Sequence, residues 1–299
     1  MRTGEAKRTH MKICSHCGAA FSGTAWTCPA CHREPVSIDG MRSFLADAVL
    51  PRANYDTAYY EKLAALERSN FWFRSRNRLI LYALKRYFPR VERFFEVGCG
   101  TGFVLSAVEE RFPRTALAGS DLYRAGLSFA ARRLKKADLF LMDARRMPFA
   151  GEYDVIGAFD VLEHVQEDGD VLVQMHRALA PRGGIILTVP HHAFLWSATD
   201  ERARHVRRYE RAELRAKVER AGFTVIRMTA FVSLLFPLMA LSRSRRRHGA
   251  GEDAVLDELR RGAFVNTALE RVLDLERFLI RAGVNFAMGG SLLLVAKKS

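Results

Sequence analysis

The chain has 299 residues, of which 49% are hydrophobic and 27% charged, an ordinary composition for a globular protein with one sizeable core and a small appendage. Its formal net charge of +14 favours an anionic partner without choosing among nucleic acid, an anionic membrane surface and an acidic substrate. No apolar run reaches the ~18 residues that a membrane-spanning helix needs, and the N-terminus lacks a hydrophobic signal region. We therefore expect a cytoplasmic protein, with peripheral contact to the inner membrane face as an open alternative.

Two C-x-x-C pairs dominate residues 13–34, and they consist of Cys14 with Cys17 and Cys28 with Cys31. Each pair can hold one metal ion from a tight turn, and four thiolates complete a tetrahedral site without an open position. The spacing predicts a zinc ribbon in which Zn²⁺ has a structural role. Iron in a rubredoxin-like site is the chemical alternative. A protein partner of the ribbon is conceivable, but the sequence does not identify one.

The segments around the ribbon have weaker patterns. Residues 1–12 are basic and lack apolar periodicity, so we expect a flexible leader. Residues 35–55 are predicted to be a linker, within which 41–50 could form a short helix. From residue 56 onward the pattern becomes helical, and it predicts helices over 57–68 and 71–87.

A glycine-rich turn follows the second helix, within residues 94–105. An apolar strand ends at Glu96 and Val97, and a helical pattern starts after Gly98, Gly100 and Gly102, whose missing Cβ atoms would let a ligand approach the backbone. The spacing E-x-G-x-G-x-G differs from the G-x-G-x-x-G of dinucleotide-binding proteins, and an acidic residue ends the strand. We therefore predict a zwitterionic ligand at this turn and not a diphosphate.

Further strands follow the glycine turn, and the apolar runs place them at residues 116–120, 139–142, 153–159, 184–189, 223–228 and 291–296. Acidic residues stand after the first three of these runs. Asp121, roughly 20 residues past the glycines, lies where an acceptor for a ribose diol is needed. Asp143 could accept a hydrogen bond from an exocyclic amine, and Asp160 ends the next strand.

Five motifs carry a family resemblance in the correct order: EVGCGTG, SD, MDARRMPF, YDVIGAFDVLEHV and LAPRGGIILTVP, starting at residues 96, 120, 142, 153 and 179. Together, over roughly residues 70–230, they resemble the class I S-adenosylmethionine-dependent methyltransferases, in particular the ubiquinone and menaquinone biosynthesis branch. The resemblance implies an α/β, Rossmann-like fold with a seven-stranded, mostly parallel sheet and helices on both faces. It also implies S-adenosylmethionine as the cofactor.

The resemblance assigns roles to particular residues. Glu96, Gly98 and Gly100 would surround the methionine part of the cofactor, while Asp121 would bind the ribose and Asp143 would lie near the adenine. An arginine on the helix over 71–87 would pair with the methionine carboxylate. Arg76 is the first candidate for this role and Arg78 the second, although the helix could instead pack on the sheet with its arginines in water. The predicted cofactor-binding set is Arg76, Glu96, Gly98, Cys99, Gly100, Gly102, Asp121, Leu122, Asp143, Ala144 and Asp160.

The loop after the strand over 184–189 is the expected acceptor loop, because open α/β sheets bind ligands at the carboxyl ends of their strands. His205 and His192 are the candidates for a base that takes the acceptor's proton, with His164 as a further histidine nearby. Orienting hydrogen bonds are the alternative role, since methyl transfer depends mainly on positioning. The cluster Asp160, Glu163 and His164 resembles a segment linked with a divalent ion in some quinone O-methyltransferases, but a helix start also explains its acidic residues.

A helical insertion at about 232–288 precedes the last strand of the domain that we assign to residues 56–299. It begins with an apolar run over 229–241, and four arginines follow this run within 243–247. Such a segment could touch a membrane surface through 229–247, or pack as a buried helix against a second helix over 264–282. In either arrangement it would roof the acceptor pocket.

Three functions are consistent with these features. The first is methyl transfer from S-adenosylmethionine to a small or lipid-linked acceptor. The second is RNA methylation, in which the ribbon and the basic surface hold the nucleic acid; residues 160–163 lack the Asn-Pro-Pro-Tyr-like motif of enzymes that methylate base amines. The third is a non-enzymatic interaction protein, which the intact glycine and carboxylate motifs argue against.

Overall fold

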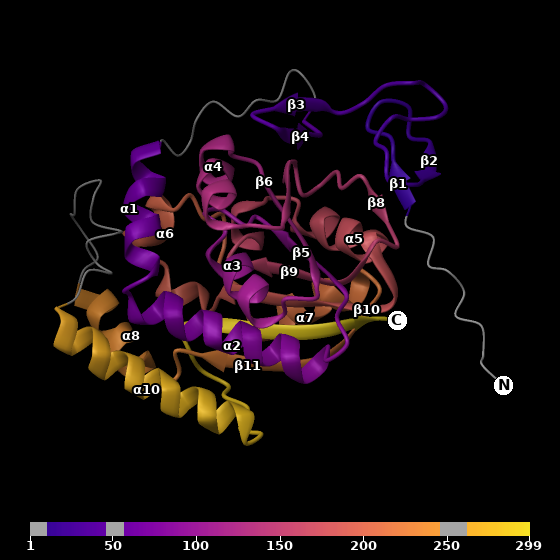
Figure 1. Cartoon of the computed structure of the whole chain (residues 1–299). Helices are drawn as coiled ribbons and strands as arrows, with labels where there is room; N and C mark the ends of the chain where they lie inside the picture. The colour runs from indigo at the N-terminus through magenta and orange to yellow at the C-terminus, as the bar shows by residue number, and fades with distance from the viewer. Residues whose placement is uncertain (1–10, 46–56, 246–261) are drawn as a thin grey trace.

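The computed structural model describes residues 11–45, 57–245 and 262–299 (Figure 1). Its centre is a nine-stranded sheet in the order β11-β12-β10-β9-β5-β6-β7-β4-β3. All seven predicted strands belong to it, with boundaries that differ by a few residues: β5 (Arg93–Val97), β6 (Ala116–Asp121), β7 (Asp138–Leu141), β9 (Tyr153–Phe159), β10 (Leu179–Pro190), β11 (Phe223–Phe231) and β12 (Ser291–Lys298).

The sheet is mostly parallel, as predicted. Strand β5 pairs in parallel with both β6 and β9, and β9 pairs in parallel with β10. Strand β12 enters antiparallel between β10 and β11. The central strands are buried along nearly their whole length, which explains why they are near-continuous apolar runs and not alternating ones.

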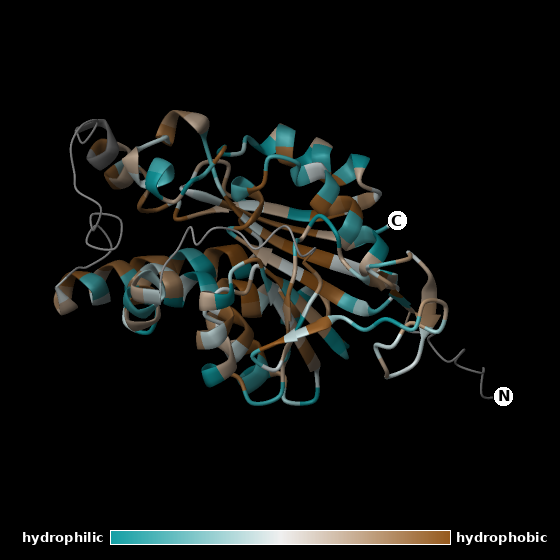
Figure 2. Ribbon diagram, turned by 90° about the horizontal axis from the view of Figure 1, so that it is seen from above, coloured by the Kyte–Doolittle hydropathy of each residue, from teal (hydrophilic) through white to brown (hydrophobic). Residues whose placement is uncertain are grey.

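Helices cover both faces of the sheet. Packing on one face involves α5 and α7, while α2, α3 and α10 pack on the other, so the sheet divides the core into two clusters. In Figure 2 the central strands are mostly brown, and the covering helices carry teal residues on their outer sides. The longer helices are α1 (Thr57–Glu67), α2 (Phe71–Tyr87), α3 (Phe103–Arg111), α4 (Arg124–Arg133), α5 (Asp168–Ala178), α7 (Arg211–Arg220), α8 (Phe236–Arg245) and α10 (Ala263–Arg281).

The N-terminal segment differs from the prediction. Residues within the predicted linker 35–55 form a hairpin, β3 (Val36–Ile38) and β4 (Met41–Ser43), and β4 pairs in parallel with the edge strand β7. None of the described residues 41–45 is helical, so the helix expected over 41–50 is wrong for these five residues, and residues 46–56 lie outside the described part of the chain. The reason is tertiary, because an edge strand offers unpaired backbone groups that a neighbouring segment can satisfy.

The predicted ribbon is joined to the sheet domain by strand pairing. Strand β1 (Met11–Ile13) pairs with β2 (Ala20–Ser22) and also with β8 (Phe149–Ala150). Residues 11 and 12 are thus part of a strand and not of the predicted leader 1–12, whose first ten residues lie outside the described part of the chain.

Aromatic packing also anchors the ribbon. The ring of Trp26 contacts Phe44, Phe140 and Phe149, with ring centroids 4.9, 5.9 and 5.9 Å away. The ammonium group of Lys12 lies 4.6 Å from the centre of the Trp26 ring and donates to three carbonyl groups within residues 23–25. The ribbon is therefore packed against the sheet domain, not tethered to it by a loop.

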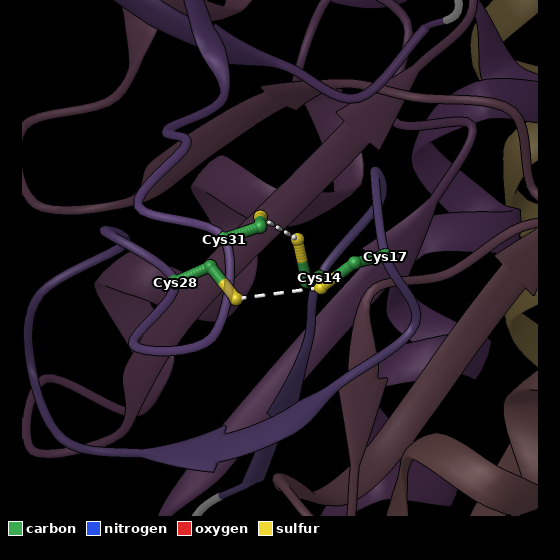
Figure 3. Close-up of side chains that lie close together, drawn as sticks. All are labelled: Cys14, Cys17, Cys28 and Cys31. Carbon is green, nitrogen blue, oxygen red and sulfur yellow. Dashed lines mark hydrogen bonds between the residues drawn. The ribbon is translucent and has the colours of Figure 1, made fainter.

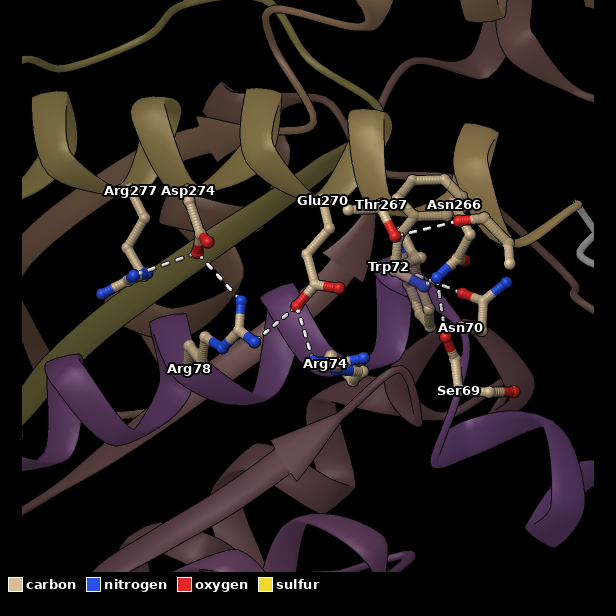
Figure 4. Close-up of polar contacts among 12 residues, drawn as sticks. Ser69, Asn70, Trp72, Arg74, Arg78, Asn266, Thr267, Glu270, Asp274 and Arg277 are labelled. Carbon is tan, nitrogen blue, oxygen red and sulfur yellow. Dashed lines mark hydrogen bonds and ion pairs between the residues drawn. The ribbon is translucent and has the colours of Figure 1, made fainter.

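The helical insertion before the last strand is present, but its first part differs from the prediction. Thr229, Ala230 and Phe231 complete the buried strand β11, so the apolar run over 229–241 is divided between a strand and helix α8. Helix α10 lies along α2, where acidic residues of α10 face arginines of α2 (Figure 4). Among the described helices, none is both long and apolar enough to cross a membrane.

Candidate active site

A cavity of about 1090 Å³ lies at the carboxyl ends of the parallel strands. The glycine turn and the ends of β6, β7 and β9 form one part of its wall. The loop after β10 forms another part, while α1, α2, α8 and α10 enclose it from the side of the helices. Ten of the eleven predicted cofactor-binding residues line it, the exception being Gly102.

The glycine turn needs its glycines for two different reasons. Gly98 has a φ of +66°, and a Cβ there would lie 2.5 Å from the side chain of Val161. Gly100 has a φ of +51°, and a Cβ there would meet nothing within 4 Å, so open space lies directly beside its backbone. Gly102 lies outside the cavity wall and lets α3 approach α4, because a Cβ would come within 3.1 Å of Ala130. The turn thus presents bare backbone to a ligand at Gly100.

Two buried carboxylates flank this turn. Asp121 accepts hydrogen bonds from the backbone N–H groups of Gly100, at 2.9 Å, and Tyr123, at 2.8 Å. Glu96 is 3% exposed, and its Oε2 atom has no hydrogen-bond partner among the described residues. Burial raises the pKa of Asp121 and raises that of Glu96 well above its usual value. A cationic ligand group beside Glu96 would supply the missing partner and favour its charged form.

The predicted arginine reaches the cavity from α2. Arg76 forms an ion pair with Asp160 at the end of β9, and its guanidinium lies 4.6 Å from the centre of the Trp72 ring. Arg78, the second candidate, points to Glu270 and Asp274 of α10 instead. The two arginines diverge because residues two positions apart on a helix are separated by about 200° around its axis.

The remaining predicted residues of the wall follow three strands: Cys99 lies in the glycine turn after β5, Leu122 follows β6, and Asp143 and Ala144 follow β7. The Asp143 carboxylate accepts from the Arg145 guanidinium at 2.7 Å, and the bonds to that side chain lower its pKa despite partial burial. Asp143 is therefore anionic and already has one partner, so a ligand amine would share it with Arg145.

The far side of the cavity contains an acid and two histidines from separate elements. The carboxylate of Glu163 is fully buried, and both of its oxygen atoms lack a hydrogen-bond partner among the described residues. The His205 ring has Nδ1 2.9 Å from Asp200 and Nε2 4.0 Å from Glu163. His164 packs against His205 with ring centroids 4.7 Å apart. Burial and the neighbouring His205 lower the pKa of His164 to about 4, so it is neutral near pH 7.

This arrangement offers one carboxylate oxygen and two imidazole nitrogens within 4.8 Å of one another. Such a set could hold a divalent cation, with Asp200 orienting the His205 ring. It could equally orient an acceptor by hydrogen bonds, the role that the sequence left open for His164 and His205. Asp160, which the sequence grouped with Glu163 and His164, pairs with Arg76 instead.

His192, the other predicted base, lies outside the cavity wall. Its ring stacks on His191 with centroids 3.5 Å apart, and its Nδ1 atom is 3.3 Å from Glu210. The strand β10 ends just before it, so the chain turns and directs this side chain away from the cavity. Of the two candidates, only His205 can reach a bound acceptor in this geometry.

Sequence reasoning did not identify Glu67 at the end of α1. This side chain is 5% exposed, lines the cavity and accepts from the hydroxyl of Thr101 in the glycine turn at 2.7 Å. Arg133 of α4 pairs with the same carboxylate at 2.9 Å. No sequence signal could have found this contact, because the three residues lie on separate elements. It connects α1 to the turn.

The four predicted metal-binding cysteines gather at one point of the ribbon (Figure 3). The Sγ atoms of Cys14 and Cys31 are 3.6 Å apart, as are those of Cys17 and Cys28. Tetrahedral Zn–S bonds of ~2.3 Å place sulfur atoms about 3.8 Å apart, so the cluster has the size of a zinc site.

The fold is that of the class I S-adenosylmethionine-dependent methyltransferases. The sequence profile of the methyltransferase domain matches residues 65–228, which is more than half of the chain, and the protein belongs to this family. A probable S-adenosylmethionine-dependent methyltransferase of Mycolicibacterium smegmatis is 24% identical over 54% of the chain and 63% of its own length. A ubiquinone/menaquinone biosynthesis C-methyltransferase of Desulfotalea psychrophila is 26% identical over 32% of the chain and 40% of its own length. The chain thus spans less than two thirds of each of these relatives.

Solved structures agree with this fold. Phosphoethanolamine N-methyltransferase 2 of Haemonchus contortus, in complex with S-adenosyl-L-methionine, superposes with a TM-score of 0.54 at 18% identity, over 83% of the chain and 59% of that protein. The complex of the Haloferax volcanii Trm112 methyltransferase activator with a methyltransferase gives a TM-score of 0.53 at 16% identity, over 81% of the chain and 94% of the matched one. At these identities the similarity concerns the fold alone.

Proposed function

We propose that the protein transfers a methyl group from S-adenosylmethionine to a small or lipid-linked acceptor that binds in the same cavity. The observation that carries this proposal is that two sets of residues line the same cavity. The first set combines the open backbone of the glycine turn with the buried carboxylates Glu96 and Asp121 and the ion pair Arg76–Asp160. The second set, which we take as the acceptor end, combines His205 with apolar side chains of α8 and α10.

The first set of residues matches the charges of the cofactor. The methionine part carries an amine, which would supply the partner that the Oε2 atom of Glu96 lacks, and a carboxylate, which Arg76 would bind. Asp121 would accept from the ribose hydroxyls, and Asp143 would lie near the adenine. When bound, the cofactor supplies an activated methyl group on its sulfonium.

The acceptor end positions a nucleophilic oxygen, nitrogen or carbon in line with the methyl–sulfur bond. As the new bond to carbon forms, the electrons of the methyl–sulfur bond stay on sulfur and the acceptor loses a proton. His205 could take that proton through Nε2, because its Nδ1 is held by Asp200. The main contribution of the protein would be alignment and the exclusion of water.

Calorimetric titration with S-adenosylhomocysteine tests the cofactor assignment. We expect micromolar binding, and Asp121→Ala should weaken it roughly 10- to 100-fold, because a hydrogen bond to a charged group is worth about 1.5–3 kcal/mol. Ser106→Ala on the outer part of α3 serves as the control and should bind as tightly as the unchanged protein. An undetectable heat in the folded, zinc-loaded protein would refute the proposed function.

His205→Ala tests the acceptor end, with His192→Ala as its matched control outside the cavity. For any acceptor found by screening, we expect the first change to lower the transfer rate at least about tenfold with S-adenosylhomocysteine affinity unchanged. His192→Ala should leave the rate within about twofold. Equal rates for all three proteins would leave His205 with an orienting role at most.

RNA methylation is the second candidate, and the net charge of +14 is the observation that favours it. In this case RNA affinity should fall steeply with salt, and methyl groups should appear in RNA. The structural match to a methyltransferase crystallised with the Trm112 activator is a further reason to test nucleic acid and protein partners. The third candidate, an interaction protein without activity, is opposed by the ten predicted cofactor-binding residues in the cavity wall.

A further inference from the structure

Helix α10 turns its acidic residues toward the protein and large apolar residues toward solvent. Glu270 and Glu276 are 7% and 2% exposed, whereas Phe264 and Phe278 are 86% and 64% exposed. A helix on the surface of a globular protein normally has the opposite arrangement. The outer side of α10 therefore fits an apolar environment better than it fits water.

Specific contacts fix this orientation. Glu270 pairs with Arg74 and Arg78 of α2, and Asp274 pairs with Arg78 at 2.9 Å (Figure 4). Glu276 accepts from the backbone N–H groups of residues 232–234 at 2.6–2.8 Å. Rotating the helix to bury its phenylalanines would break all of these contacts. The apolar outer side is thus built into the fold.

Neighbouring apolar residues extend this outer side around the opening of the cavity. Leu238 and Val265 line the cavity and are nevertheless 60% and 47% exposed, so the cavity reaches the surface between α8 and α10. Both helices lie on the side of the molecule opposite the ribbon (Figure 1). We define the docking face as the exposed residues Leu238, Leu241, Phe264, Val265, Leu275 and Phe278.

The exposed charged residues on α10 have one sign. Arg271 and Arg281 are exposed there, and the Arg281 guanidinium lies 5.8 Å from the centre of the Tyr82 ring of α2, while the acidic residues of the helix point inward and have partners. Exposed apolar side chains beside exposed arginines, on a helix whose own acids all point inward, match the surface of a bilayer that contains anionic lipids.

We propose that the docking face binds the surface of an anionic bilayer, so that the cavity opens toward the membrane and receives its acceptor from there. The inference rests on the proposed function and deepens it, because it assigns the acceptor to the lipid-linked class. Phe264 and Phe278 would enter the headgroup region, and Arg271 and Arg281 would meet lipid phosphates.

Cosedimentation with vesicles tests this proposal on the full chain. The probes are vesicles of phosphatidylcholine mixed with phosphatidylglycerol, and vesicles of phosphatidylcholine alone. The test variant combines Phe264→Ser with Phe278→Ser, and its matched control combines Val36→Ser with Val173→Ser, which are 55% and 52% exposed on other elements. A charge variant combines Arg271→Gln with Arg281→Gln. Titration with S-adenosylhomocysteine accompanies each protein and reports the cofactor site separately.

We expect the protein to bind the mixed vesicles and the Phe264/Phe278 variant to lose at least about tenfold in partitioning, with cofactor affinity unchanged. Each arginine removed should cost roughly fivefold, and the control variant should bind like the unchanged protein. The proposal would be overturned if the protein did not bind the mixed vesicles, or if the Phe264/Phe278 variant bound them as strongly as the unchanged protein. Either result would leave the methyltransferase assignment intact. A dimer seen by sedimentation velocity would also overturn the proposal if the Phe264/Phe278 variant were monomeric, because the docking face would then bind a second copy of the chain. Absent binding of S-adenosylhomocysteine would instead refute the proposed function itself.

Discussion

Among single residues, the candidate site contains buried carboxyl groups with oxygen atoms that lack a hydrogen-bond partner in the described part of the chain. Glu96 and Glu163 are two such groups, and desolvation in the interior raises their pKa values. Leaving such a group unpaired destabilises the folded state unless it stays protonated. These two carboxyl groups therefore lower the stability of the ligand-free protein. Such groups are expected in a binding site, where the ligand supplies the missing hydrogen-bond partners.

Glu96→Gln should make the protein more stable at neutral pH while weakening cofactor binding. Since the folded-state pKa of Glu96 lies above its ordinary value of 4.5, the folded protein binds more protons, and its stability falls as pH rises through that window. The gain in Tm should thus be largest near pH 8 and should shrink toward about pH 4, where both states are protonated. Thermal unfolding across this range measures it, with Glu110→Gln on the surface of α3 as the control. A Tm difference that does not vary with pH would mean that Glu96 is charged in the folded protein.

At the scale of elements, the N-terminal segment is part of the methyltransferase sheet. Strand β4 continues the sheet beyond β7, and the backbone N–H of Phe44 donates to the carbonyl of Leu141 at 2.8 Å. Leu141 directly precedes Met142 and Asp143, which line the cavity. Any loosening of the ribbon should therefore reach the end of β7 where the adenine is expected.

Removal of the metal tests this connection. We expect Cys28→Ser, or treatment with a strong chelator, to lower Tm by several degrees and to weaken S-adenosylhomocysteine binding, because ribbon and sheet share the Trp26 packing. His16→Ala, beside the cysteines but outside the cluster, is the control. Elemental analysis should find one zinc per chain in the unchanged protein and in the control. Full stability without metal would show that the sheet does not depend on a loaded ribbon.

At the scale of the whole molecule, segments far apart in the chain enclose one cavity. Helices α1 and α2 lie between β4 and β5 in sequence, whereas α8 and α10 lie between β11 and β12, and all four contribute to the cavity wall. Contacts such as that of Asn266, whose side chain accepts from the backbone N–H of Phe71 at 2.8 Å, hold these helices together. Ligand binding should therefore stabilise the molecule as a whole.

Saturation with S-adenosylhomocysteine should raise Tm by mass action. At a ligand concentration of about 100 times Kd the folded state gains ~2.7 kcal/mol, which corresponds to roughly 5–10 °C for a chain of this size. Differential scanning fluorimetry measures the shift, and adenosine, which lacks the methionine part, should give a smaller one. An equal shift with adenosine would mean that Glu96 and Arg76 do not contact the ligand.

The sequence by itself determined the seven core strands, the order of the motifs and the glycine turn. These features follow from local rules, since apolar runs predict buried strands, and a turn with positive φ and an open ligand side needs glycine. The set of acidic residues at strand ends could be predicted for the same reason, because parallel strands place their carboxyl ends at one edge.

Only the tertiary structure decided where the remaining side chains point. It paired the short segment β4 with an edge strand, divided the apolar run over 229–241 between β11 and α8, and turned Arg78 and His192 away from the cavity. It also brought Glu67 to the glycine turn and oriented the apolar side of α10 outward. Each of these outcomes depends on a partner that is distant in sequence. Local sequence preferences give the competing conformations nearly equal free energies, and the backbone groups or charges of the partner decide between them.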